Sequence, residues 1–130
     1  MRKKNRFKAA YHGLSSVFES EQNFRIHLFA FVIVILFGVF FGLSNLEWIA
    51  ILSCSFLVLI CEVFNTAIET LCDHISPNYD VLIGKVKDIS AAAVLVSSIM
   101  SVVVGAIIFI PYLIELWADR VKISSPEVLV

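Results

Sequence analysis

The chain has 130 residues, of which 59% are hydrophobic and 16% charged, and its formal net charge is −1. This apolar content lies well above the roughly 45–50% of soluble domains. With a mean hydropathy of +0.91, it excludes an ordinary water-soluble globular protein. So small a net charge gives no electrostatic reason to expect a nucleic-acid partner. The sequence therefore predicts one small all-α integral membrane domain over residues 1–130.

Residues 1–26 are predicted to form an amphipathic surface helix. Apolar side chains recur at helical spacing, at Phe7, Tyr11, Leu14 and Phe18. Charged residues occupy the other faces of the helix. Such a helix lies in the membrane interface as an anchor, or covers a site there as a lid. We expect Ser20 to cap the segment that follows, with Glu21 near its first turn.

Three apolar stretches follow, at residues 27–44, 48–72 and 89–114. Each is close to the roughly 20 residues that a helix needs to cross the hydrocarbon core. The first is not expected to be a signal peptide, because a charged amphipathic stretch precedes it and no small-residue cleavage pattern follows. The pattern predicts three transmembrane helices.

The basic residues predict the orientation of these helices. Six precede the first span and two lie between the second and third, whereas residues 44–47 contain none; the eight are Arg2, Lys3, Lys4, Arg6, Lys8, Arg25, Lys85 and Lys87. Because basic residues favour the cytoplasmic side, the N-terminus and the 73–88 segment are predicted to be cytoplasmic.

Polar residues interrupt the second span at regular intervals. Glu62, Asn65, Glu69 and Asp73, called here the polar stripe, fall within about 80° on one helix face, with Thr66 beside them. Since a carboxylate at bilayer depth costs roughly 2.5 to 3.5 kcal/mol, the polar stripe must face protein, metal or water rather than lipid. It is the leading candidate for a functional site.

The segment after the polar stripe contains a turn signal at Ser76–Asp80 and the pair Gly84-Lys85. A phosphate-binding loop is excluded, because Tyr79 stands where the upstream glycine is required and Val86 where Ser or Thr is required. Lys87 and Asp88 are expected to open the third span, where the lysine can neutralise phosphate oxygens. The cysteines and histidines have no metal-ligand spacing, and we assign them no chemistry.

The polar stripe and the following loop resemble a known family. Glu62-x-x-Asn65-Thr66-Ala67-Ile68-Glu69-x-x-x-Asp73, followed by Lys87-Asp88, is similar to the prokaryotic diacylglycerol kinase family, which includes undecaprenol kinases. The resemblance covers essentially the whole chain, and Phe64 and Cys72 depart from the usual residues beside the polar stripe. It implies a surface helix and three transmembrane helices, assembled as a homotrimer with shared active sites in the bacterial inner membrane.

The resemblance also implies roles for individual residues. Glu62 would be the general base, and Glu21 and Glu69 the Mg²⁺ ligands. The nucleotide, ATP, would be surrounded by Glu21, Asn65, Glu69, Asn78, Tyr79, Asp80, Lys87 and Asp88. Glu62 and Ala91 would contact the lipid alcohol. The segment Asn23–His27 is closer to the undecaprenol kinases, so undecaprenol is the expected substrate and diacylglycerol the alternative.

These residue types suit phosphoryl transfer on their own chemistry, because such transfer requires a metal at the phosphates, positive charge and a base near the attacking hydroxyl. Glu62 lies about 10 Å deeper than Glu69, where it can meet a lipid hydroxyl. A different class, a small oligomeric ion- or proton-conducting protein in which Glu62 and Glu69 relay ions, also fits the composition.

Overall fold

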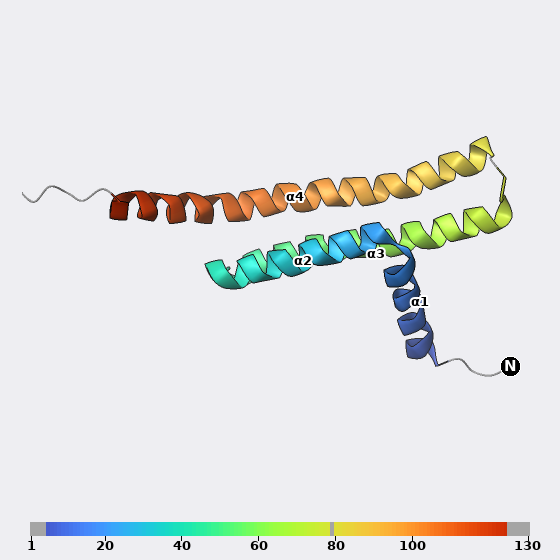
Figure 1. Ribbon diagram of the computed structural model, residues 1–130, viewed down its shortest axis with the longest axis horizontal. Helices are drawn as coiled ribbons and strands as arrows, with labels where there is room; N and C mark the ends of the chain where they lie inside the picture. The colour runs from blue at the N-terminus through green and yellow to red at the C-terminus, as the bar shows by residue number, and fades with distance from the viewer. Residues whose placement is uncertain (1–4, 79, 125–130) are drawn as a thin grey trace, which may run out of the picture.

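The computed structural model describes residues 5–78 and 80–124, and this part of the chain folds as four helices with no strand. The helices are α1 (Arg6–Ser20), α2 (Gln22–Phe41), α3 (Asn45–Ile75) and α4 (Val81–Ser124). Figure 1 shows α2, α3 and α4 running side by side while α1 leaves the bundle at a steep angle. Because α2, α3 and α4 are long and apolar enough to cross a membrane, the predicted fold class is confirmed.

The corner between α1 and α2 is formed by one extended residue, Glu21, which ends α1 and precedes α2. The prediction that Ser20 caps α2 is wrong, because its hydroxyl lies 3.3 Å from Glu21 Oε1 instead. Arg25 Nη1 donates to the carbonyl oxygens of Phe18 and Glu19 at 2.8 and 3.0 Å. These bonds satisfy carbonyls that the end of α1 leaves without helical partners, and so fix Glu21 at the corner.

At the opposite end of the bundle, Gly42 ends α2 in the left-handed region with φ of 68°. The helix therefore stops at Phe41, before the predicted limit at residue 44. Ser44 and Glu47 then form a capping box that starts α3. Glu47 Oε2 also accepts a hydrogen bond of 2.9 Å from the Tyr112 hydroxyl, which ties the start of α3 to α4.

Gly38 is required where α2 approaches α3. A Cβ atom at this position would lie 2.6 Å from Trp48 Cη2 and 3.1 Å from Leu43 Cδ1. Gly38→Ala is therefore expected to destabilise the folded protein by about 1–3 kcal/mol, the usual effect of overpacking, measured by unfolding in detergent micelles. The matched control is Gly105→Ala, where the added Cβ meets nothing within 4 Å. Equal stability of the two variants would contradict this packing.

The helices extend beyond the predicted spans on the polar side of the bundle. The predicted loop 73–88 is wrong, because α3 continues to Ile75 and α4 begins at Val81. Asp80 Oδ1 accepts from the backbone N–H groups of Leu82 and Ile83 at 2.8 and 3.0 Å, which starts α4 early. At 44 residues α4 is about 66 Å long, so it must project beyond a hydrocarbon core of about 30 Å.

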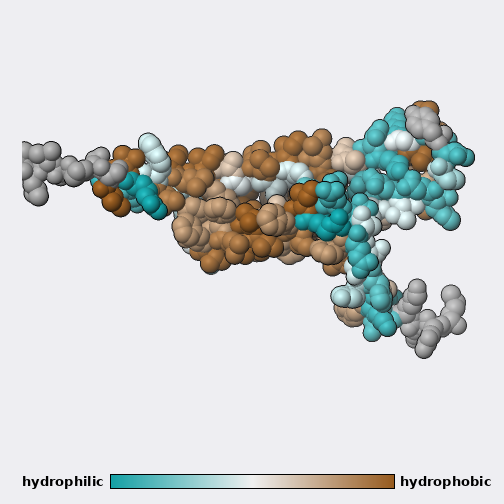
Figure 2. All heavy atoms as spheres, in the orientation of Figure 1, coloured by the Kyte–Doolittle hydropathy of each residue, from teal (hydrophilic) through white to brown (hydrophobic). Residues whose placement is uncertain are grey.

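α3 is the central helix of the bundle. A third (33%) of its most apolar window is buried, against 11% for α2 and 6% for α4. Figure 2 shows apolar residues covering the middle of the bundle, while hydrophilic residues gather on α1 and at the α3–α4 turn. The polar stripe therefore lies on the helix that contacts the other three, and runs from its middle to the end where the hydrophilic surface begins.

Candidate active site

Three of the four residues of the polar stripe are buried or half-buried against protein, while the fourth, Asp73, is exposed. Glu62 is only 3% exposed, although it lies midway along an apolar helix. Thr66 is also buried, and its hydroxyl donates to the Glu62 carbonyl oxygen at 2.9 Å. Asn65 and Glu69, about one and two turns nearer the hydrophilic end, are half-buried. The helix thus presents one buried carboxylate and a second, more accessible one along the same face.

The buried carboxylate of Glu62 pairs with a histidine from another helix. His27 Nε2 lies 3.3 Å from Glu62 Oε1, and the two side chains are 28% and 4% exposed. Two further carboxylates, Glu21 and Glu69, lie near enough for their charges to act on Glu62. From the sequence alone we assign His27 no chemical role and so do not predict this pairing. The local sequence around either residue does not determine which residues of α2 and α3 face each other.

Asn65 links the polar stripe to α4. Its Nδ2 donates to Glu69 Oε1 at 3.1 Å, and its Oδ1 lies 2.5 Å from the hydroxyl of buried Ser90. Because an ionised Glu69 can only accept, the amide N–H must face Glu69 and the serine must donate to Oδ1. Glu69 therefore fixes which way the Asn65 amide points, and Ser90 ties the amide oxygen to α4.

The resemblance implies phosphoryl transfer, and Ser90→Ala is expected to lower that activity two- to tenfold without unfolding the protein, because one hydrogen bond is worth roughly 0.5–1.5 kcal/mol. The measurement is the steady-state rate at several ATP concentrations. Ser97→Ala is the matched control, since Ser97 is equally buried on α4 but its hydroxyl lies 2.9 Å from the Val94 carbonyl of its own helix. Equal losses in both variants would show that Ser90 matters only for packing.

The predicted residues beyond the polar stripe lie around the α3–α4 turn. Lys87 Nζ lies 2.7 Å from Asp73 Oδ1, so this cation already has an acidic partner on α3. Asp80 caps α4 through Oδ1, and the Asn78 carbonyl accepts from the Ser76 hydroxyl at 2.9 Å. Asp88 and Ala91 are exposed on α4. Tyr79, the remaining predicted residue, lies outside the described residues.

Glu21 and Glu69 have the chemistry that a hard cation needs. In the described part of the chain, each carboxylate accepts one side-chain hydrogen bond at Oε1, which leaves its second oxygen for a ligand. No group of three or more His, Cys, Asp or Glu side chains placed to hold a metal occurs among residues 5–78 and 80–124. Any cation here must complete its shell with water or substrate oxygens, which is the usual situation for Mg²⁺.

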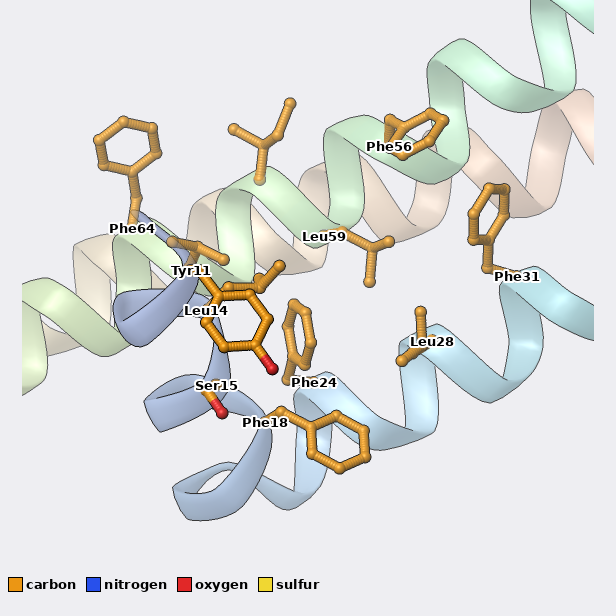
Figure 3. Close-up of a pocket in the computed structure, with 12 residues that line it drawn as sticks. Tyr11, Leu14, Ser15, Phe18, Phe24, Leu28, Phe31, Phe56, Leu59 and Phe64 are labelled. Carbon is orange, nitrogen blue, oxygen red and sulfur yellow. The ribbon is translucent and has the colours of Figure 1, made fainter. Parts of the chain in front are cut away.

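An apolar pocket of about 690 Å³ lies between α1, α2 and α3. Figure 3 shows side chains from all three helices converging on it, including Leu14 and Phe18 of α1, Phe24 of α2 and Phe56 of α3. Leu59 and Val63, which flank Glu62 along α3, also line the pocket. Only two of its lining residues, Tyr11 and Ser15, carry polar side-chain atoms, so it suits a long hydrocarbon chain.

These features define a helical membrane protein with a carboxylate site where an apolar pocket meets a hydrophilic surface. Residues 8–109 match the sequence profile of the prokaryotic diacylglycerol kinase family. The chain belongs to this family.

Named relatives agree with this assignment. A diacylglycerol kinase of Synechocystis is 36% identical over 111 residues, which is 85% of this chain and 63% of that protein. A diacylglycerol kinase of Haemophilus influenzae is 35% identical, covering 81% of this chain and 90% of that protein. An undecaprenol kinase of Bacillus subtilis is 34% identical, covering 82% and 89%.

The chain is accordingly a lipid kinase, a phosphotransferase with an alcohol acceptor, and a bacterial membrane protein. This outcome decides against the ion-conducting class, which composition alone left open. The relatives include kinases named for two different lipids at almost equal identity, 35% and 34%. Overall similarity therefore does not choose the lipid.

Proposed function

We propose that this protein transfers the γ-phosphate of ATP to the hydroxyl of undecaprenol at the cytoplasmic face of the bacterial inner membrane. The observation that carries the proposal is the position of Glu62: a buried carboxylate between two residues that line an apolar pocket. It lies about two turns along the same helix face from the more accessible Glu69. A lipid hydroxyl and a water-soluble nucleotide can meet only at such a boundary.

Glu62 is the proposed general base. A carboxylate within hydrogen-bond reach of the acceptor hydroxyl can take its proton as the oxygen attacks the γ-phosphorus and ADP leaves. Burial of Glu62 keeps bulk water from competing with the lipid as the acceptor. The hydrocarbon chain lies in the pocket of Figure 3, which presents the hydroxyl toward α3.

Glu21 and Glu69 are the proposed Mg²⁺ ligands, and bound Mg²⁺ would neutralise charge that develops on the phosphates. Asn65 holds Glu69 through its 3.1 Å hydrogen bond, while Lys87 and Asp88 approach the nucleotide from α4. Asn78, Tyr79 and Asp80 complete the proposed nucleotide site from the α3–α4 turn. Asp80 has one oxygen committed to capping α4, so its second oxygen is the one available to the nucleotide.

The pocket favours undecaprenol over diacylglycerol. Undecaprenol carries one hydroxyl on an otherwise apolar, methyl-branched chain, whereas diacylglycerol also brings two ester groups close to its hydroxyl. Each polar group buried without a hydrogen-bond partner costs free energy, and only Tyr11 and Ser15 offer side-chain hydroxyls in the lining. Ala91, which we propose to contact the lipid from α4, adds no polar atom.

The proposed orientation follows the distribution of basic residues, which favours a cytoplasmic position for the N-terminus and the α3–α4 turn, where ATP is available. We also propose that the whole chain, residues 1–130, is a single domain that assembles as a homotrimer with shared active sites. The large apolar faces of α4, only 6% buried in one chain, are the surfaces available for such assembly or for lipid.

The test is a side-by-side assay of undecaprenol and diacylglycerol with γ-labelled ATP, using the purified protein in lipid bilayers. We expect magnesium-dependent transfer to both alcohols to be measurable, with the larger kcat/KM for undecaprenol. A larger kcat/KM for diacylglycerol would replace the proposed substrate with the alternative. ATP turnover that needs neither lipid would contradict the function itself.

A further inference from the structure

His27 is the one histidine that the described structure places against the polar stripe, and the proposed reaction gives it no role. Its Nε2 reaches across from α2 to Glu62 Oε1 at 3.3 Å. Phe24, three residues before His27 on α2, and Leu28, the residue after it, both line the apolar pocket. Placing a polar ring at an apolar helix interface costs free energy unless the ring makes a specific interaction. For His27 this interaction is the contact with the Glu62 carboxylate.

The charges around Glu62 make this contact significant. The charged or titratable groups that act on it are His27 on α2, Glu21 at the α1–α2 corner and Glu69 on α3. The last two are acidic, and together with burial they oppose a negative charge on Glu62. A general base must nevertheless be ionised before the lipid hydroxyl arrives. Among these three groups, only His27 can stabilise the ionised form.

We propose that His27 is a positioning residue for phosphoryl transfer, whose imidazole Nε2, 3.3 Å from Glu62 Oε1, holds the carboxylate ionised with Oε2 turned toward the lipid hydroxyl. This inference rests on the proposed function, in which Glu62 is the base. The hydroxyl proton passes to Oε2 as the new O–P bond forms and the bond to ADP breaks, so no further reactant is required. His27 contacts neither lipid nor nucleotide and acts through Glu62.

The test compares His27→Leu, which removes the donor, with His27→Gln, which keeps an uncharged donor of similar reach. We expect kcat to fall roughly 10- to 100-fold in the leucine variant, as for other residues that orient a reacting group, with KM for ATP unchanged. The acidic limb of the pH–rate profile should move to higher pH, because nothing then offsets the burial of the Glu62 carboxylate. His27→Gln should recover much of the rate and lie between the two profiles.

His12→Gln is the matched control, because His12 is an exposed histidine on α1 whose described ring contact is with its neighbour Tyr11. It should keep the wild-type rate and pH profile. Adding His27→Leu to Glu62→Gln should cause no further loss, since the positioned group is already gone.

The results separate this inference from the function on which it rests. Wild-type protein that transfers no phosphate to a lipid alcohol, or Glu62→Gln that stays active, would overturn the proposed function. If the wild type is active and Glu62→Gln is not, two results overturn the role of His27 alone: a wild-type rate in His27→Leu, or a lost rate with an unmoved pH limb and no recovery in His27→Gln.

Discussion

Glu62→Gln is expected to lower lipid phosphorylation by about 100- to 10 000-fold, the range that general-base catalysis supplies. Glutamine keeps the shape of the side chain and can still contact His27, but it cannot accept the hydroxyl proton. Because Glu62 is 3% exposed and its neighbour Thr66 bonds its backbone rather than its carboxylate, the helix should stay intact. The measurement is transfer of labelled phosphate at saturating ATP and lipid.

Glu47→Gln is the matched control for this variant. Glu47 lies on the same helix, but at the opposite end, where its carboxylate completes the capping box and accepts from Tyr112. Glutamine is also compatible with a capping box, so the control should lose little stability and no activity. Near-normal turnover in Glu62→Gln, with nucleotide binding retained, would remove Glu62 from the chemistry.

The transmembrane helices could be predicted from the sequence because a helix that crosses the bilayer requires a long apolar stretch. The ends of the helices could not be predicted, since a helix continues into water wherever local hydrogen bonds support it. The N-terminal end of α4 is polar from Lys85 to Asp88, which is why a loop was predicted there. Asp80 instead caps a helix that begins at Val81, eight residues before the predicted span. Gly42 shortens α2 for an equally local reason, its left-handed backbone.

The polar stripe could also be predicted, because its spacing depends only on the geometry of one helix. Contacts between two helices depend on their relative register, which cannot be predicted from the sequence of either helix alone. The bond from Ser90 to Asn65 joins residues 25 positions apart, and His27 and Glu62 come from different helices. The sequence thus predicts the candidate carboxylates, while the structure shows which side chains from other helices contact them.

Glu21 and Glu69 are expected to act as one magnesium site although they belong to different parts of the fold. Each single change to Gln should lower Mg-ATP-dependent turnover by roughly 100- to 1000-fold, the range for losing a group that stabilises transition-state charge. The magnesium concentration needed for half-maximal activity should rise in both variants. The double variant should be little worse than the poorer single one, because residues that act as a unit are not additive.

Glu19→Gln controls for the simple loss of negative charge near the corner. Glu19 lies two residues before Glu21 and its side chain is exposed. Only its backbone carbonyl contacts Arg25, as a hydrogen-bond acceptor. This variant should keep the wild-type magnesium requirement. If the effects of Glu21→Gln and Glu69→Gln multiply in the double variant, the two carboxylates act independently. The corner between α1 and α2 would then serve the nucleotide in some way other than through an ion shared with α3.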